Sequence, residues 1–473
     1  MFYGRESELQ QLKALLKKET ASLVVMRGRR RIGKSTLVEK FAESFGLFCE
    51  FQGLAPRSGL KDDDQRRNFS EQMGKIFKIP PLQLDHWTEA FAHLASHTRK
   101  GRTLIFLDEI SWMAGGESDF LGKLKIVWDT EFKKNPRLVL VLCGSVSSWI
   151  DNNILRDADF VGRVSLEINL QELPLKDCHE FWRDKKGRIS SMEKAKILCA
   201  VGGVPKYLEE VDFSASSEKN IQRLFFKKSG LLFNEFDKIF SDIFSQRAPR
   251  YKDIVGVLVS GKCSALEVAK KLGLSQNGDI TEYLTDLEKS DFLSRDYTWQ
   301  FDGRKSRISR YRIRDNYLRF YLKYVEPIRE KIRSGLYEPR GLESLKHWSL
   351  IFGFQFENLI LNNLGAVLNH LEIDPNSVIS ASPYFQRKTK GNKGACQIDL
   401  LIHTRFSTLY LCEIKFRVRI GKEVIDEVIQ KINLLKRPKG MSIRPVLICE
   451  GEISEEVLES DFFDQIISFK DLL

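Results

Sequence analysis

The chain of 473 residues lacks long apolar runs and has few cysteines. No run approaches the roughly 20 apolar residues of a membrane span. The opening segment, Met1-Phe2-Tyr3-Gly4-Arg5-Glu6, lacks the basic and then apolar profile of a signal peptide. The eight cysteines are scattered without a Cys-x-x-Cys pair, which argues against a zinc site or a disulfide framework. These absences predict a cytoplasmic protein that does not contact membranes and whose thiols are reduced and buried.

The length and the net charge of the chain indicate how many domains it has and what kind of partner it binds. A chain of this length is too long for one hydrophobic core and predicts three or four domains. The 75 Lys and Arg residues exceed the 64 Asp and Glu residues, which gives a net charge of +11. From Arg295 to Arg333, twelve basic residues stand against five acidic ones, so this segment alone carries +7. This excess favours an anionic partner and places a basic face in the segment.

The most informative motif is a phosphate-binding loop, Gly28 to Ser35, which follows the apolar run Leu23 to Met26 and precedes a helix-like segment. Glycines in such a loop let backbone N–H groups face the phosphates, a lysine adds positive charge, and a hydroxyl coordinates Mg²⁺. A chance glycine-rich turn is the weaker alternative. The residues predicted to bind the nucleotide are Gly28, Arg29, Arg30, Arg31, Ile32, Gly33, Lys34, Ser35 and Thr36.

A second apolar run, Thr103 to Leu107, ends in Asp108 and Glu109, as expected for a buried parallel strand that delivers carboxylates to its C-terminal edge. We expect Asp108 to hold Mg²⁺ with Ser35, and Glu109 to orient the attacking water. A solvated turn is the alternative. Ser145 follows another apolar run and is expected at the same edge, where it senses the γ-phosphate. Lys34, Glu109 and Ser145 are thus the catalytic candidates here.

Residues 1–170 alternate strand-like and helix-like stretches, which is typical of a parallel sheet with helices on both faces. The expected strands are Leu23–Met26, Leu47–Phe51, Leu104–Leu107, Leu138–Leu142 and Val164–Leu170. Residues 171–245 read as a helical lid over the nucleotide. Residues 246–335 read as a winged helix-turn-helix, and residues 336–473 as a further α/β domain. The sequence therefore predicts a multidomain α/β protein.

The first half of the chain resembles the signal-transduction ATPases with numerous domains, which are close relatives of the AAA+ ATPases, and among them the archaeal-type ATPases. The boxes that carry the resemblance, besides the loop and the strand ends, are Phe2-Tyr3-Gly4-Arg5-Glu6-x-Glu8-Leu9, Gly162-Arg163 and Gly202-Gly203-Val204-Pro205. The resemblance implies hydrolysis of ATP with Mg²⁺ and places Arg5 and Pro205 near the base. Arg163 either reaches the γ-phosphate, from its own or a neighbouring subunit, or pairs with a surface acid. We also expect a homo-oligomer.

The expected wing of the helix-turn-helix is strongly basic, with Arg304, Lys305, Arg307 and Arg310. In the DNA-binding interpretation these side chains contact phosphates and supply affinity without sequence preference. The alternative is a structural module whose wing contacts the ATPase or a neighbouring chain.

The C-terminal segment carries a second constellation, in which Asp399 is followed by Glu413-Ile414-Lys415. Alternation of apolar and polar residues puts Glu413 and Lys415 on one face of a strand. Glu357 falls in the middle of an apolar helical stripe that is expected to be buried. The Asp399 to Lys415 spacing resembles the PD-(D/E)xK nuclease superfamily, which implies a restriction-endonuclease-like fold.

Three acids and a lysine would suit Mg²⁺ or Mn²⁺, with Glu357, Asp399 and Glu413 as ligands and Lys415 orienting the nucleophile. Gln430 and Lys431 both compete for the supporting position that the superfamily often fills. The alternative is an Asp399 to Lys415 salt bridge in a fold that has lost activity.

These observations predict an ATP-dependent switch or motor in which a lid and a winged helix transmit the nucleotide state to a metal-dependent nuclease-like domain acting on DNA. A regulatory or signalling ATPase with an inert C-terminal interaction module is the main alternative. A structural oligomer that bridges DNA is a third.

Overall fold

The computed structural model describes residues 2–57, 59–157, 159–185, 189–244, 247–274, 278–337, 348–386 and 394–473. They divide into two compact units. The N-terminal unit comprises Met1–Glu172, Lys238–Pro249 and Lys289–Asp291, and the C-terminal unit comprises Leu173–Asp237, Arg250–Glu288 and Phe292–Leu473. The predicted division into four segments stays a prediction, and its boundary at residues 245–246 lies outside the described residues.

A five-stranded sheet forms the centre of the N-terminal unit, with strand order β2-β3-β4-β1-β5. All neighbouring strands are parallel, which confirms the expected parallel sheet and the position of each expected strand. The strands are β1 (Ser22–Arg27), β2 (Leu47–Gln52), β3 (Thr103–Asp108), β4 (Leu138–Gly144) and β5 (Val164–Asn169). Their carboxyl ends meet at one edge of the sheet.

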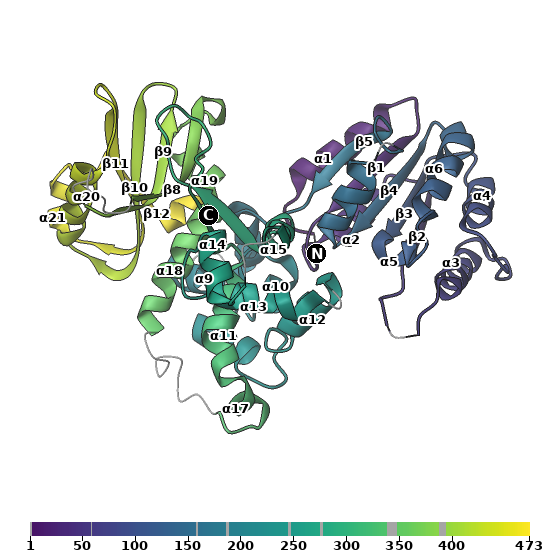
Figure 1. Cartoon of the computed structure of the whole chain (residues 1–473), viewed down its shortest axis with the longest axis horizontal. Coiled ribbons are helices and arrows are strands. Elements are labelled where there is room, and N and C mark those ends of the chain that lie inside the picture. Colours follow the sequence, from purple (N-terminus) through teal and green to yellow (C-terminus); the bar gives the residue numbers. More distant parts are fainter. Residues whose placement is uncertain are drawn as a thin grey trace. The chain divides into compact units, whose positions relative to one another are not determined.

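Helices cover both faces of this sheet (Figure 1). The covering elements include α1 (Glu6–Ala14), α2 (Lys34–Ala42), α3 (Asp62–Phe77), α4 (Trp87–His97), α5 (Ile110–Ala114), α6 (Phe120–Thr130) and α7 (Ser147–Ile150). Side chains alternate along β1, so that Val24 packs with α1 and α2 while Val25 packs with α3, α4 and α6. Because both faces are buried, the strand sequences are continuous apolar runs.

The C-terminal unit begins with helices, as expected for residues 171–245. These helices are α8 (Leu175–His179), α9 (Ser191–Val201), α10 (Pro205–Glu209) and α11 (Ser217–Phe225). The next helix, α12 (Glu235–Phe244), has residues that belong to each of the two units. Three helices and an antiparallel hairpin follow in the expected order: α13 (Ala248–Leu258), α14 (Ala265–Lys271), α15 (Gly278–Lys289), β6 (Leu293–Tyr297) and β7 (Ser309–Ile313). We call residues 248–313 the helix–hairpin segment. It leads into α16 (Asn316–Phe320) and α17 (Arg329–Arg333).

A second five-stranded sheet, with order β12-β11-β10-β9-β8, is mixed. Strand β9 pairs antiparallel with both β8 and β10, whereas β11 pairs parallel with both β10 and β12. The elements are α18 (Trp348–Asn362), α19 (Leu364–His370), β8 (Val378–Gln386), β9 (Cys396–Thr404), β10 (Thr408–Ile420), α20 (Glu423–Leu434), β11 (Ser442–Ile453), α21 (Glu455–Glu459) and β12 (Gln465–Ser468).

The hairpin of the helix–hairpin segment packs on this C-terminal sheet. Trp299, just after β6, is buried in the same hydrophobic cluster as Ile398 and Leu411, and its indole N–H lies 3.2 Å from Nδ1 of His403. The Thr298 hydroxyl donates to the carbonyl of Phe385 (3.0 Å). Part of the predicted wing is therefore an internal packing surface, and its partner is the C-terminal sheet.

All eight cysteines are free and buried, as predicted. Within the described ranges, no helix has both the length and the apolar character needed to cross a membrane.

Candidate functional site

Two glycines shape the phosphate loop. Gly28 has φ +150°, and a Cβ there would lie 2.4 Å from the carbonyl oxygen of Leu170. Gly33 has φ +93° and is the residue before helix α2. Both positions exclude ordinary side chains. The loop therefore bends sharply between β1 and α2, as the sequence predicts.

Lys34 lies at the start of α2 and its side chain is buried beneath the loop. Its ammonium donates to the carbonyls of Gly28 (2.8 Å) and Arg29 (3.1 Å) and to the hydroxyl of Ser145 (2.9 Å). All three acceptors are uncharged. These hydrogen bonds hold the ammonium group in place, and none of the three acceptors carries a negative charge. The positive charge can therefore attract a phosphate.

The predicted magnesium ligands lie together at the carboxyl edge of the sheet. The Ser35 hydroxyl donates to Oδ2 of Asp108 across 3.0 Å, and the other carboxylate oxygen of Asp108 accepts from the backbone N–H of Glu109 (3.0 Å). A hydroxyl and a carboxylate are hard oxygen donors that suit Mg²⁺, whose remaining ligands are normally phosphates and water. The residues present fit that ion.

Glu109 is oriented by Ser145. One carboxylate oxygen of Glu109 accepts from the Ser145 hydroxyl (2.6 Å) and the other from its backbone N–H (3.1 Å). Both residues are buried, and Glu109 adopts a left-handed backbone conformation with φ +51°. Lys34, Ser145 and Glu109 therefore form a continuous chain of hydrogen bonds across the ends of β3 and β4.

Two further arginines stabilise the loop rather than project from it. Arg5 is buried and donates to the carbonyl of Ile32 (3.1 Å) and to that of Gln171. Arg29, also buried, forms an ion pair with Glu172 (3.2 Å). Of the remaining predicted loop residues, Arg30 and Arg31 are half-buried and Thr36 is exposed.

Two predicted residues take no part in the hydrogen bonds described so far. Arg163 pairs with Asp129 through Nε and Nη2, at 2.8 to 3.2 Å, which is the surface pair that the sequence left open for it. Pro205 is the first residue of α10 and belongs to the C-terminal unit. The roles predicted for both in nucleotide chemistry stay predictions.

The C-terminal unit brings together all four residues predicted for its second site. Glu357 of α18, Asp399 of β9, and Glu413 and Lys415 of β10 line one cavity of about 960 Å³, which we call the acid cavity. Met192, Lys196 and Glu218 from the first helices of the unit also line it. The expectation that Glu413 and Lys415 share a face is confirmed, since their charged groups are 2.8 Å apart.

Most charges in the acid cavity are compensated by lysines. Glu413, 1% exposed, contacts Lys415 and also Lys431 of α20 (2.5 Å), and Lys415 contacts Glu427 of the same helix (2.5 Å). Asp399 instead accepts from the backbone N–H of Ile414 (3.0 Å). The alternative of an Asp399 to Lys415 salt bridge is therefore wrong in its partner: the lysine pairs with two glutamates.

The surroundings shift the pKa values of Asp399 and Lys415. Burial raises the pKa of Asp399 to about 7, and the nearby charges of Glu413 and Glu357 act in the same direction. Burial alone would lower the pKa of Lys415, but the carboxylates of Glu413 and Glu427 outweigh it and raise that pKa.

The predicted metal site is not supported by this arrangement. Glu357 pairs with Lys262 of the helix–hairpin segment (3.0 Å), so two of the three expected ligands, Glu357 and Glu413, contact ammonium groups. Over the parts of the chain that the structure describes, no group of three His, Cys, Asp or Glu side chains is arranged to hold a metal ion. A divalent ion would have to compete with those lysines.

The apolar stripe expected to be buried around Glu357 is not the buried face of α18. Phe354 is 59% exposed, while Phe356, Leu359 and Ile360 are buried. The stripe faces the cavities, which explains why it contains an acid; the Leu350 side chain lies outside the described residues.

Sequence reasoning left Lys431 of this site unresolved and missed two charged residues, Glu427 and Lys262. Lys431 was one of two open candidates, and the structure places its ammonium on Glu413, while Gln430 also lines the acid cavity. Glu427 lies one turn before Lys431 on α20, a spacing that could have indicated it. Lys262 has no such signal, because it is 95 residues from Glu357 along the chain.

Comparison with known proteins finds a family match for the N-terminal part of the chain. Residues 2–211 match a family described as an ATPase domain predominantly from Archaea. The chain is 25% identical over 364 residues to an uncharacterized protein of Methanocaldococcus jannaschii, which covers 76% of each. It is 41% identical over 54 residues to an uncharacterized ATP-binding protein of the same organism, covering 10% of this chain and 92% of that protein.

Among solved structures, a Walker-type ATPase of Pyrococcus abyssi is similar with a TM-score of 0.49 and 17% identity, over 68% of this chain and 96% of that one. The family match shows that this chain carries an archaeal-type ATPase domain.

Proposed function

We propose that this chain, which carries an archaeal-type ATPase domain, hydrolyses ATP at the carboxyl edge of its N-terminal sheet and uses the nucleotide state to control a DNA-binding C-terminal unit. The observation that carries the proposal is the hydrogen-bonded chain from Lys34 through Ser145 to Glu109, beside the Ser35–Asp108 pair. A purely structural loop would not need five buried or half-buried polar groups to converge at one point.

The chain's own residues divide the work as follows. Lys34 and the loop N–H groups bind and orient the β- and γ-phosphates. Ser35 and Asp108 hold Mg²⁺, which when bound neutralises charge on the phosphates. Glu109 orients a water for attack, and Ser145 fixes both Glu109 and Lys34, so that loss of the γ-phosphate changes the contacts of all three.

DNA is the partner that the charges favour. The net charge is +11, and the segment from Arg295 to Arg333 carries more than half of it. Several of these basic side chains lie on the hairpin of β6 and β7, among them Arg310 and Arg312 on β7. Cationic side chains of this kind contact the phosphate backbone and bind with little sequence preference.

The test is ATP turnover measured with and without DNA. We expect hydrolysis that requires Mg²⁺ and a rate that changes when linear DNA is added. Hydrolysis without any response to DNA, together with no DNA binding at low salt, would retain the ATPase but overturn the DNA part of the proposal.

Phosphodiester cleavage is a second candidate function, favoured by the convergence of Glu357, Asp399, Glu413 and Lys415 on one cavity. The compensating lysines favour the opposite outcome, an inert interaction module. Incubation with linear and circular DNA, with Mg²⁺ or Mn²⁺, separates the two. Cleavage that is lost in Asp399→Ala and Lys415→Ala but kept in Lys422→Ala, an exposed residue before α20, would support the nuclease; intact DNA throughout would support the inert module.

A further inference from the structure

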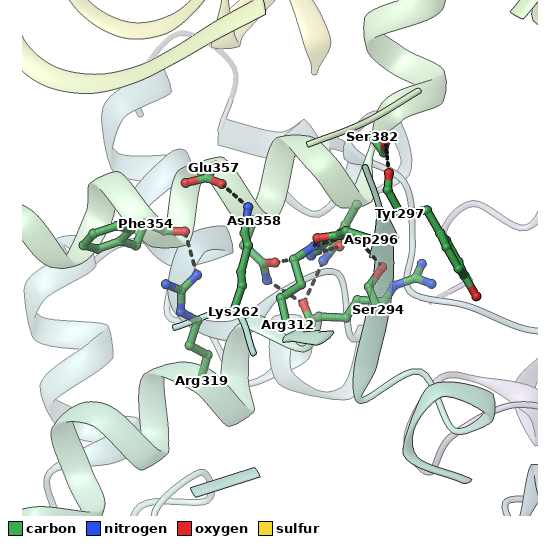
Figure 2. Close-up of polar contacts among 12 residues, drawn as sticks. Lys262, Ser294, Asp296, Tyr297, Arg312, Arg319, Phe354, Glu357, Asn358 and Ser382 are labelled. Atoms are coloured by element: carbon green, nitrogen blue, oxygen red, sulfur yellow. Dashed lines mark hydrogen bonds and ion pairs between the residues drawn. The ribbon is translucent and has the colours of Figure 1, made fainter. Parts of the chain in front are cut away.

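A second, smaller cavity lies between the helix–hairpin segment and helix α18. Its volume is about 320 Å³, and we call it the basic cavity. The charged residues that line it are Lys262, Arg310, Arg312, Arg319 and Glu357. Four cations thus face one carboxylate. Figure 2 shows Lys262, Arg312 and Arg319 approaching the stretch of α18 that carries Phe354, Glu357 and Asn358.

Arg312 is the most firmly positioned of these cations. Its Nε lies 3.0 Å from a carboxylate oxygen of Asp296, and its Nη1 donates to the side-chain oxygens of Asn358 and Asn362. The side chain of Arg312 is 10% exposed. A guanidinium fixed in this way forms a rigid wall of the cavity, with its orientation set before any ligand binds.

Arg319 is held by an uncharged group, whereas Arg310 contacts an aromatic ring and one carboxylate. Arg319 donates to the carbonyl of Phe354 (3.0 Å), and its guanidinium lies 5.5 Å from the centre of the Phe354 ring. Arg310 lies over the Phe385 ring (5.2 Å) and is 3.7 Å from Glu267. Burial lowers the pKa of Arg319, although the Glu357 charge opposes that shift, so an anion beside this guanidinium would be favoured.

We propose that the basic cavity binds a backbone phosphate of a DNA strand and holds the strand next to the acid cavity. This inference rests on the proposed DNA binding and makes it more specific. Guanidinium groups match the oxygen geometry of phosphates. The basic and acid cavities share Phe354, Glu357 and Gln397 as lining residues, so a phosphate bound in one lies beside the other.

The proposal changes which basic residues matter. The predicted wing residues Arg304 and Arg310 belong to one hairpin, but Arg304 has 86% of its side chain exposed, whereas Arg310 has 26% exposed and lines the basic cavity. In a DNA-binding wing of the usual kind, the outward residue contributes most to the affinity for DNA. If the phosphate binds in the basic cavity, the inward residues contribute most to that affinity.

Glu357 has a defined role in this arrangement. It is the single carboxylate lining the basic cavity, and it pairs with Lys262. An incoming phosphate therefore competes with Glu357 for the lysine. Removal of the carboxylate charge should strengthen phosphate binding, which is opposite in sign to the effect of removing an arginine.

The experiment measures the affinity of the full chain for a short fluorescein-labelled oligonucleotide, single-stranded and duplex, in EDTA so that nothing is cleaved. We expect the double variant Arg310→Gln/Arg319→Gln to weaken oligonucleotide binding about tenfold or more. The slope of log K against the logarithm of the salt concentration should become shallower by about one to two. Arg304→Gln tests the outward-wing interpretation and should change affinity less than about twofold, and Lys227→Gln, an exposed residue that lines neither cavity, is the matched control. Glu357→Gln should bind several-fold more tightly, a result that misfolding cannot produce.

Each other outcome overturns a distinct statement. If Arg304→Gln weakens binding as much as the double variant does, or if Glu357→Gln weakens it, the basic cavity is not the phosphate site. If the unmodified chain does not bind either oligonucleotide, the proposed DNA binding itself fails. Binding of inorganic pyrophosphate that is lost in Arg310→Gln/Arg319→Gln, without any oligonucleotide binding, would show that the cavity accepts small phosphates and not a strand, and would also contradict the proposal.

Discussion

In the N-terminal unit the ammonium of Lys34 contacts two carbonyls and a hydroxyl, whereas in the C-terminal unit the ammonium groups of Lys415 and Lys431 contact carboxylates. The same contrast holds for the acids. Within the part of the chain that the structure describes, Glu109 accepts hydrogen bonds from Ser145, an uncharged residue, while Glu413 lies between two lysines. The first site therefore presents uncompensated charges to a ligand, and the second is compensated without one.

This difference has a physical consequence. A charge held by neutral dipoles stays available to an incoming ion of opposite sign, and it interacts strongly there because the surroundings are buried. A charge that is already paired must give up its partner when a ligand binds, and this exchange reduces the net free energy of binding. The proposed ATP site is therefore arranged to accept its ligand, whereas binding at the acid cavity requires rearrangement.

The largest expected effect concerns Glu109. Glu109→Gln removes the carboxylate that orients water but keeps its hydrogen-bonding shape, so hydrolysis should fall by about 10² to 10³ while ATP affinity changes less than about threefold. Phosphate release and calorimetric binding of ATP measure the two quantities. Glu19→Gln, on the exposed surface of the same unit, should behave like the parent; hydrolysis at the parental rate in Glu109→Gln would remove the residue from the mechanism.

A smaller loss is expected from Ser145→Ala. The change removes the hydroxyl that links Lys34 to Glu109, so both groups lose orientation, and hydrolysis should fall by about 10- to 100-fold. ATP turnover is again the measurement, and Ser148→Ala on α7 is the matched control. Equal rates in the two variants would show that the hydrogen-bonded chain has no catalytic role.

In the C-terminal unit the expected effect is on stability. Lys431→Met leaves buried Glu413 with Lys415 as its remaining ammonium partner and should lower the free energy of unfolding by about 2 kcal/mol. Urea unfolding followed by circular dichroism measures it, with exposed Lys436→Met as control. The double variant Glu413→Leu/Lys431→Met should recover part of the loss; if Lys431→Met has parental stability, the charges are not compensated in the way described.

The smallest effect concerns Arg163. Its hydrogen bonds, together with those of Lys133, lower the pKa of Asp129 to about 2 from an ordinary value of 3.8. A lowered carboxyl pKa stabilises the fold above pH 3.8, and this stabilisation disappears as the pH falls toward 2. Arg163→Ala should therefore lower the stability only slightly at neutral pH, because the pair is partly exposed.

The difference in stability between Arg163→Ala and the parent should shrink over the same acid range, and hydrolysis should stay within about twofold of the parent. Acid unfolding and ATP turnover check the two statements. A large loss of turnover in Arg163→Ala but not in Asp129→Asn would instead assign the arginine to catalysis.

The sequence predicted the hydrogen-bonded arrangement of the proposed ATP site because its parts are local or follow from strand order, while the roles of these residues stay predictions. The loop is one continuous segment, Asp108 is the last residue of buried strand β3 and Ser145 directly follows buried strand β4, so parallel pairing brings them to one edge. In the acid cavity, strand alternation correctly placed Glu413 and Lys415 on one face.

Other contacts could not be predicted from the sequence. Lys431 lies at the margin of an amphipathic helix, where the helical wheel does not separate it from Gln430. The pairing of Lys262 with Glu357 depends on how the helix–hairpin segment packs against α18, which no local pattern encodes. The exposure of Phe354 has the same origin, since α18 borders two cavities.

The most direct test of the account is calorimetric titration of ATP with Mg²⁺ into the full chain and into Lys34→Ala. The uncompensated ammonium of Lys34 predicts saturable binding by the parent and an affinity lower by about 100-fold or more in the variant. Equal affinities, or no binding by the parent, would contradict the claim that this loop is a nucleotide site.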